Sequence, residues 1–250
     1  MTPDKGTYDE RAARVDLVCA LRSAERLGLA EGVCNHCSLA VPGRPGQFLI
    51  NPQGLHWSEV VPDDLVIVDA AGKHVAGKYA VEPTAFFIHG RIHRASPRAQ
   101  CVLHTHMPHA TALTLIEGGE LAWASQNALR FYGRVTYERA YNGLALDAAE
   151  GDRMAASVRN ADVVFLANHG VIVCGPSAAY AFDDLYYLER ACELQLLAQS
   201  SGRPLKIVPA EIAEATRAQM DAERQQSALH LAALKRILDR EQPGWRGNSG

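Results

Sequence analysis

The sequence lacks any long apolar run, and no stretch of it approaches the roughly 18–20 residues that a membrane-spanning helix needs. It also lacks a block of lysine and arginine, and its formal net charge is −3. The polar N-terminal segment has no apolar core of a signal peptide. We therefore expect a cytoplasmic protein that binds neither nucleic acid nor membrane.

Paired cysteine motifs are scarce. The chain has six cysteines, and only Cys34 and Cys37 have the C-x-x-C spacing. A structural zinc site needs a second such pair, and a redox motif would open a helix, whereas this segment continues as extended chain. We expect reduced thiols, with Cys34 and Cys37 in packing and substrate-loop positions.

Internal repeats, low-complexity tracts and linker-like breaks are also missing. The chain has 250 residues, of which 48% are hydrophobic and 21% charged, as in an ordinary globular protein. Strand and helix patterns alternate along its whole length. We predict one α/β domain over residues 1–250 with a mixed sheet, ending in a helical tail over residues 205–242.

The individual elements follow from periodicity and from turn residues. We predict helices, strands and a hairpin over the following segments. Helices are expected over 9–27, from Pro83 to before Pro97, over 109–117 and 148–159, from the N-cap Ser177 to 199, and as one long helix over 209–239; strands are expected over 63–77 as a hairpin, 99–105, 133–141 and 162–175.

Residues 101–110, CVLHTHMPHA, hold the most informative cluster. Residues i and i+2 of a strand point to one face, so His104 and His106 project together. Two imidazoles at a strand end form half of a zinc site, and His169, in a turn followed by Gly170, is the best third ligand. Histidines satisfied by hydrogen bonds in the core remain an alternative, and His109 is expected to line the pocket or to pack.

Another histidine pair, His89 and His93, has the i, i+4 spacing on the helix that begins at Pro83. No glutamate follows His89 directly, so the metalloprotease motif is absent. The neighbouring residues Phe86, Phe87 and Ile88 favour packing between helices as the role of this pair, with one of the two histidines close to the site.

Several segments together resemble the class II aldolase/adducin family. They are GVCNHCSL near the start, VLHTHMPHATAL, ANHGVIVCG and AFDDLYYLERACELQLLA, in the family's order over residues 10–200. The resemblance implies a three-layer α/β/α domain with a largely antiparallel sheet, in a cyclic homotetramer whose active sites lie between subunits. It also implies that His104, His106 and His169 bind a divalent metal, zinc foremost, with Mn²⁺ and Fe²⁺ as alternatives.

The sequence departs from the family's sugar-phosphate aldolases where these carry Ser-Ser-Glu, because Pro83-Thr84-Ala85 stands there instead. Glu82 lies one helical turn earlier and is the candidate acid/base that replaces the missing glutamate. A helix N-terminal charge without a catalytic role is the alternative for Glu82. The family's catalytic tyrosine, donated by a neighbouring subunit, aligns with Gln126.

Part of the family's substrate-binding loops is retained. We expect substrate contacts from Asn35, His36, Gly54 and Thr84, with His56 near the pocket. The altered phosphate-binding residues favour a metal-dependent carbon–carbon lyase that decarboxylates or cleaves a small hydroxy-aromatic or keto acid through a metal-stabilised enolate. A sugar-phosphate aldolase, a metal-dependent oxygenase or dehydratase, and a non-catalytic adducin-like binding protein remain alternatives.

Overall fold

The computed structural model describes residues 8–143, 148–159 and 161–247, without the side chains of residues 83, 84, 86, 87 and 148–150. The helices are α1 (Glu10–Arg26), the 3-10 helix η1 (Pro62–Asp64), α2 (Pro83–Ala95), α3 (Pro108–Thr114), α4 (Gln126–Leu129), α5 (Ala148–Ser157), α6 (Ala178–Gln199), α7 (Ala210–Ala222) and α8 (Gln226–Glu241). The strands are β1 (His36–Ala40), β2 (Gln47–Ile50), β3 (Val66–Asp69), β4 (His74–Ala76), β5 (Cys101–Thr105), β6 (Val135–Glu138), β7 (Val163–Leu166) and β8 (Gly170–Gly175).

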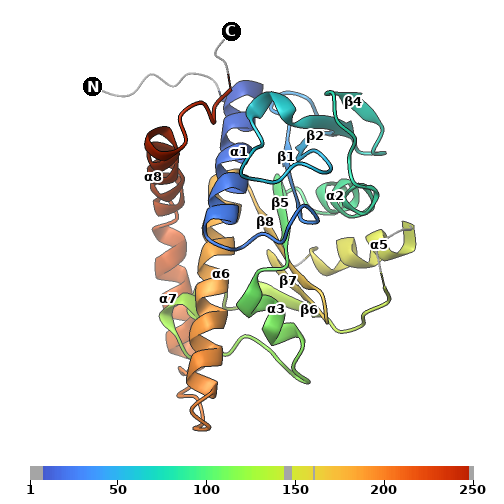
Figure 1. The fold of residues 1–250 in the computed structure, drawn as a ribbon. Coiled ribbons are helices and arrows are strands. Elements are labelled where there is room, and N and C mark those ends of the chain that lie inside the picture. Colours follow the sequence, from blue (N-terminus) through green and yellow to red (C-terminus); the bar gives the residue numbers. More distant parts are fainter. Residues whose placement is uncertain (1–7, 144–147, 160, 248–250) are drawn as a thin grey trace.

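The strands form one eight-stranded sheet in the order β4-β3-β2-β1-β5-β8-β7-β6. Every neighbouring pair is antiparallel except β6 and β7. Helices α1, α6 and α8 cover one face, and α2 and α5 lie on the other (Figure 1). The three-layer α/β/α arrangement with a mixed, largely antiparallel sheet is therefore confirmed.

Alternation along the strands separates the two cores. In β5, Cys101 and Leu103 pack with α1 and α6, whereas Val102 packs with α2 and α5. His104 follows Val102 by two residues and so faces α2 rather than the long helices. A polar side chain at this position lies at the end of an apolar layer, where it needs hydrogen-bond partners.

Most predicted elements agree with the structure, including the hairpin of β3 and β4 and the N-cap at Ser177, whose hydroxyl accepts a hydrogen bond from the Tyr180 amide. The single long helix predicted over 209–239 is wrong. The chain forms α7 and α8, which are separated around Arg224. Arg224 donates two hydrogen bonds to Asp184 of α6, and we attribute the break to this buried attachment, which outweighs local helix propensity.

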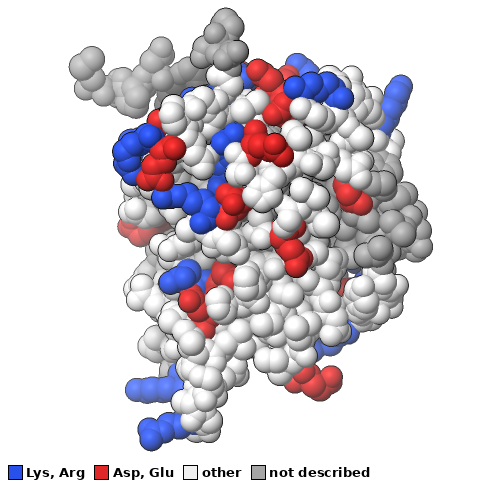
Figure 2. All heavy atoms as spheres, in the orientation of Figure 1, with Lys and Arg blue, Asp and Glu red and all other residues white. Residues whose placement is uncertain are grey.

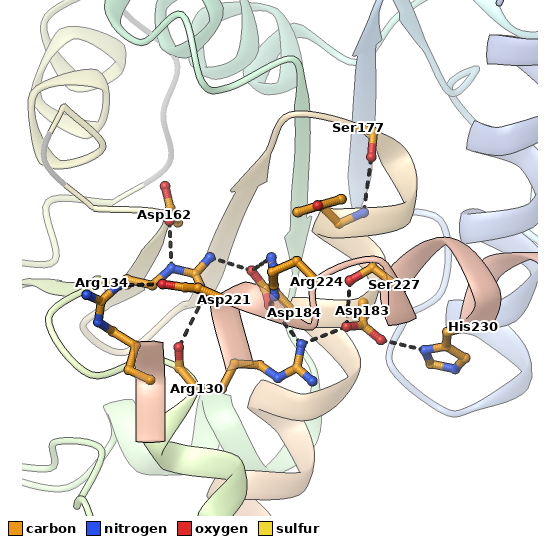
Figure 3. Close-up of polar contacts among 12 residues, drawn as sticks. Arg130, Arg134, Asp162, Ser177, Asp183, Asp184, Asp221, Arg224, Ser227 and His230 are labelled. Carbon is orange, nitrogen blue, oxygen red and sulfur yellow. Dashed lines mark hydrogen bonds and ion pairs between the residues drawn. The ribbon is translucent and has the colours of Figure 1, made fainter. Parts of the chain in front are cut away.

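A buried ionic network joins the C-terminal helices to α6 (Figure 3). Asp184 is fully buried and accepts hydrogen bonds from Arg134, at 2.6 Å, and from both terminal nitrogens of Arg224, at 2.6 and 2.9 Å. The neighbouring Asp183 accepts hydrogen bonds from Ser227 and His230 of α8. Each carboxylate is thus matched by donors, which offsets the cost of removing its charge from water.

The surface and the cysteines agree with the expectations from composition. On the face shown in Figure 2, acidic and basic side chains are interspersed. None of the helices in the described ranges is long and apolar enough to cross a membrane. All six cysteines are free, as predicted.

We expect Arg224→Leu to lower the free energy of unfolding by about 3 kcal/mol, because it leaves Asp184 buried with an incomplete set of partners. The matched control is Arg217→Leu, which removes an exposed pair with Asp221 and should cost below about 1 kcal/mol. Urea unfolding of both variants measures the difference. Equal losses would show that the network contributes no more than a surface ion pair.

Candidate metal centre

Three histidines converge at the end of β5. His104 and His106 project from one face of this strand, and His169 comes from the turn between β7 and β8. One ligand nitrogen of each lies within 4.8 Å of the others, and the ring centroids are 4.8–5.1 Å apart. The three rings are oriented edge-on or tilted, so their nitrogens can point to a common centre.

The turn that carries His169 is held by two backbone features. Asn168 has φ 56°, a left-handed conformation that is uncommon outside glycine. Gly170, which follows His169, is not among the glycines with positive φ, so Asn168 supplies the left-handed residue of this turn. Gly170 instead allows the Thr105 carbonyl and the His106 ring to lie close to the backbone of β8. A Cβ at this position would lie 2.6 Å from the Thr105 carbonyl oxygen and 2.9 Å from the His106 ring.

The second nitrogen of each β5 histidine has its own partner. His104 Nδ1 donates to the Val171 carbonyl at 2.9 Å, and His106 Nδ1 lies 2.6 Å from the Glu31 carboxylate. These partners orient the Nε2 atoms toward the centre, as around protein-bound zinc. Burial, and then the neighbouring histidines, lower the pKa of His104 well below its ordinary value, so its ring is neutral.

The surroundings of His106 Nε2 indicate whether a metal fits between the three histidines. This atom is buried and has no hydrogen-bond partner among the described residues. A buried nitrogen left in this state is costly unless a ligand satisfies it. Neutral imidazoles with oriented Nε2 atoms suit Zn²⁺, Fe²⁺ and Mn²⁺ in varying degree. The donor set therefore fits a divalent metal.

The histidines lie at the end of a cavity of about 670 Å³. Its wall comes from the loop before β1, from residues 53 and 54, from α2 and its N-cap, from β5 and from the loops after β6 and β7. The lining residues are Val33, Cys34, His36, Gln53, Gly54, Glu82, Ile88, His104, His106, Tyr141, Gly143, Asn168 and His169.

Some of the predicted substrate-binding residues line the cavity, and others lie outside its wall. His36 and Gly54 line the cavity. Asn35 is buried beside it and does not line it; its side-chain oxygen accepts a hydrogen bond from the Glu31 amide, so Asn35 braces the loop that holds His106. His56 is hydrogen-bonded to Ser58 and is not part of the wall. The side chain of Thr84 lies outside the described residues.

The two predicted catalytic residues, Glu82 and Gln126, also differ in their position relative to the cavity. Glu82 lines the cavity, and its Oε2 lies 4.0 Å from His36 Nε2. The same carboxylate is the N-cap of α2, accepting a hydrogen bond from the Ala85 amide, and it is not a member of the histidine cluster. Gln126 is exposed and does not line the cavity of its own chain. Its action from a neighbouring subunit of a homotetramer stays a prediction.

The roles expected for two other histidines need correction. His89 and His93 were expected to pack between helices, but both are hydrogen-bonded to Ser38 of β1, at 2.6 and 2.7 Å. His109 lies away from the cavity, and its Nδ1 contacts Glu189 at 2.8 Å.

Tyr141 is a cavity residue that the sequence did not reveal. It follows β6, which runs parallel to β7, and its ring centroid lies 6.4 Å from that of His169. The parallel pairing brings the residues after both strands to the same edge of the sheet. A polar aromatic residue at the end of the strand predicted over 133–141 was the available signal, but the strand that pairs with it was not predictable.

Comparison with known proteins agrees with this geometry. Residues 15–196 match the model of the Class II Aldolase and Adducin N-terminal domain. The chain belongs to the class II aldolase and adducin family. It is 35% identical to a putative aldolase class 2 protein of Pseudomonas aeruginosa, over 95% of this chain and 93% of that protein. It is 32% identical to the decarboxylase NovR of Streptomyces niveus, over 93% and 88%.

A crystal structure of an aldolase II superfamily protein from Pseudomonas syringae has the same fold. Its TM-score is 0.88 at 35% identity, with 97% of this chain and 98% of that chain covered. Class II aldolases are typically dependent on a divalent metal, and the histidine triad of this family member could hold such an ion.

We expect His106→Ala to abolish binding of zinc, because the two remaining histidines leave the coordination incomplete. The matched control is His109→Asn, which keeps a donor for Glu189 and leaves the cluster intact. Metal content after loading and gel filtration measures both. Full zinc occupancy in His106→Ala would remove the cluster as the metal site.

Gly170→Ala should weaken zinc binding without removing a ligand, because the new methyl group displaces the backbone at Thr105 or the His106 ring. Loss of an orienting contact typically costs 10–100-fold in metal affinity, and we expect a loss of about this size. Competition with a chromophoric chelator measures the affinity. An unchanged affinity would show that the close contact of residue 170 with Thr105 and the His106 ring does not set the geometry of the ligands.

Proposed function

We propose that the protein is a divalent-metal-dependent carbon–carbon lyase that decarboxylates or cleaves a small oxygenated acid. The observation that carries the proposal is the buried His106 Nε2, which has no hydrogen-bond partner among the described residues and lies beside His104 and His169 in the wall of a cavity. The similarity to NovR, which is named as a decarboxylase, supports the reaction class. Zinc is the metal that we propose first.

The proposed reaction breaks a C–C bond and leaves the electron pair of that bond on the substrate. A bound metal supplies Lewis-acid stabilisation of the oxygen that takes up this charge, worth several kcal/mol. His104, His106 and His169 would hold the metal. The hydrogen bonds of His104 to Val171 and of His106 to Glu31 keep these two rings fixed, which limits reorganisation when charge develops.

Glu82 is the proposed proton donor and acceptor. Its carboxylate lines the cavity at the N-terminus of α2 and is partly exposed, with 31% of the side chain accessible. The hydrogen bond from the Ala85 amide fixes one oxygen. A carboxylate in this position can reach a substrate that is held between the histidines and His36.

The cavity wall favours an acid over a sugar phosphate. Among the described lining residues none is lysine or arginine. The serines that hold the phosphate in the sugar-phosphate aldolases are replaced by Pro83 and Thr84. The wall instead offers His36, Gln53 and Tyr141, which suit hydroxyl and carboxylate groups.

The test is release of CO₂ from a panel of hydroxy-aromatic and β-keto acids by protein loaded with Zn²⁺, Mn²⁺ or Fe²⁺. Cleavage of L-fuculose 1-phosphate is assayed in parallel. We expect CO₂ release in the absence of oxygen. Turnover that requires oxygen would favour an oxygenase, and sugar-phosphate cleavage alone would favour an aldolase. Failure to bind any of the three metals would contradict a metalloenzyme.

Glu82→Gln should lower kcat by about 10² or more while zinc stays bound, because the amide cannot take part in proton transfer. Glutamine keeps a side-chain oxygen that can accept from the Ala85 amide, so the α2 cap is retained. Single-turnover rates and metal content measure the two effects. Unchanged turnover would leave Glu82 as a helix cap only.

A further inference from the structure

A second cavity, of about 430 Å³, lies at the C-terminal end of β8, whereas the histidine cluster lies at the other end of this strand. Four arginines from separate parts of the chain line this cavity: Arg98 before β5, Arg134 before β6, Arg217 on α7 and Arg224 between α7 and α8. The six residues of β8 span about 20 Å. The cavity is therefore a site of its own, which we call the arginine cavity.

Two aspartates, one in the cavity wall and one behind it, are shared among three of these arginines. Asp184, behind the wall, accepts hydrogen bonds from Arg134 at 2.6 Å and from both terminal nitrogens of Arg224 (Figure 3). Asp162, in the wall, accepts a hydrogen bond from Arg134 Nε at 2.8 Å and lies 3.5 Å from Arg98 Nη1. Two carboxylates thus serve three guanidinium groups, which leaves one positive charge in excess.

The ion pairs next to this group do not cancel the excess. Arg217 pairs with Asp221 on α7, so this pair adds one charge of each sign. Arg130 pairs with Asp183 at 2.7 Å, and its Nη1 also lies 3.7 Å from Asp184. The cluster of arginines and aspartates around the cavity therefore keeps a net positive charge.

The guanidinium groups also have N–H donors that the ion pairs do not use. Each guanidinium carries five N–H groups. Arg224 is 9% exposed and donates through Nη1 and Nη2 only, so its Nε has no hydrogen-bond partner within the part of the chain that the structure describes. Arg217 donates through Nη1 alone to a residue of that part. A buried donor beside a cavity indicates an acceptor in that cavity.

We propose that the arginine cavity binds the phosphate group of a small phosphate monoester. Near pH 7 such a group carries a charge of about −1.5 to −2 and three acceptor oxygens, which matches an excess of positive charge and donors that come from several directions. Planar guanidinium groups bind phosphate oxygens in pairs. A carboxylate has only two oxygens and one charge, and therefore fits this set of donors less well.

The rest of the cavity leaves room for the organic part of the ester. Its volume lies in the range of sites for small organic ligands. Tyr180 lines it, with the Arg224 guanidinium over the ring at 4.6 Å from the centroid, and Cys174 and Pro176 add apolar surface. A bound ester would thereby connect α7 and the junction between α7 and α8 with the end of β8.

Binding is tested by calorimetry on the full chain, with and without zinc, in a buffer that contains no phosphate. The ligands are ribose 5-phosphate, AMP and inorganic phosphate, and ribose and adenosine are the controls that lack the phosphate group. We expect saturable binding of at least one ester, equal with and without zinc, and no binding of the controls. Absence of saturable ester binding, ester binding that requires zinc, or tighter binding of inorganic phosphate than of both esters would overturn the proposal.

Arg217→Gln removes a guanidinium group from the cavity wall at a partly exposed position, where the ion pair contributes little to stability. We expect the affinity for the ester to fall by about tenfold or more, because a hydrogen bond to a charged group is lost. Arg98→Gln, at an exposed position, should have the same effect. The matched control is Arg190→Gln, because Arg190 is also a helix arginine with a carboxylate partner, Glu193, and lies outside this cavity. Unchanged affinity in both test variants, or an equal loss in the control, would overturn the assignment of the site.

Hydrogen exchange locates the bound ester without an assay of activity. We expect slower amide exchange in α7 and at residues 223–226 when the ester is bound, because the ligand would join these segments to β8. Slower exchange confined to residues 101–110 and 166–171 would place the ester at the histidine cluster and would overturn the proposal. Neither metal nor turnover enters this measurement, so its outcome is separate from that of the proposed lyase function.

Discussion

The antiparallel pairing of β5 with β8 is the contact on which the site depends. Its register sets Thr105 beside Val171 and leaves only glycine at position 170, opposite the His106 ring. The carbonyl of Val171 orients the His104 ring across the same pair of strands. His104 and the turn that carries His169 thus belong to one ladder, and His106 follows directly after it and is oriented by Glu31 of the loop before β1.

The layer beneath α2 shows the cost of placing imidazoles in an apolar environment. His36, His89 and His104 are each at most 4% exposed. A buried imidazole is tolerated when both nitrogens have suitable partners. The structure supplies such partners to both nitrogens of His89, through His36 and Ser38, and to His104 Nδ1, through the Val171 carbonyl.

The strand histidines could be predicted because their placement needs only the alternation of side chains. His169 was predictable as well, since a histidine before glycine in a short turn between apolar strands has few other roles. The role of His89 and His93 could not be predicted, because the helix periodicity does not say whether a face packs on a helix or on the sheet. Ser38, two residues beyond His36 on β1, carried no local signal at all.

The break between α7 and α8 shows a second limit. Local patterns favour one continuous amphipathic helix, whereas the structure depends on Arg224 reaching Asp184, forty residues earlier in the chain. Tyr141 enters the cavity only because β6 pairs with β7 in parallel. Long-range pairings of this kind determine which polar residues meet, and a single sequence does not specify them.

The placement of the histidines by the sheet and of the cavity wall by loops explains how the chain can keep the three histidines and differ from the sugar-phosphate aldolases. His104 and His106 are fixed by the sheet, whereas the wall that would contact the substrate comes from the start of β1, the Gly54 loop, the N-cap of α2 and the loop after β6. A changed residue at Glu82 or Pro83 alters that wall and leaves the β5–β8 ladder as it is. Substrate chemistry can therefore change at the N-terminus of α2 while the sheet preserves the arrangement of the histidines.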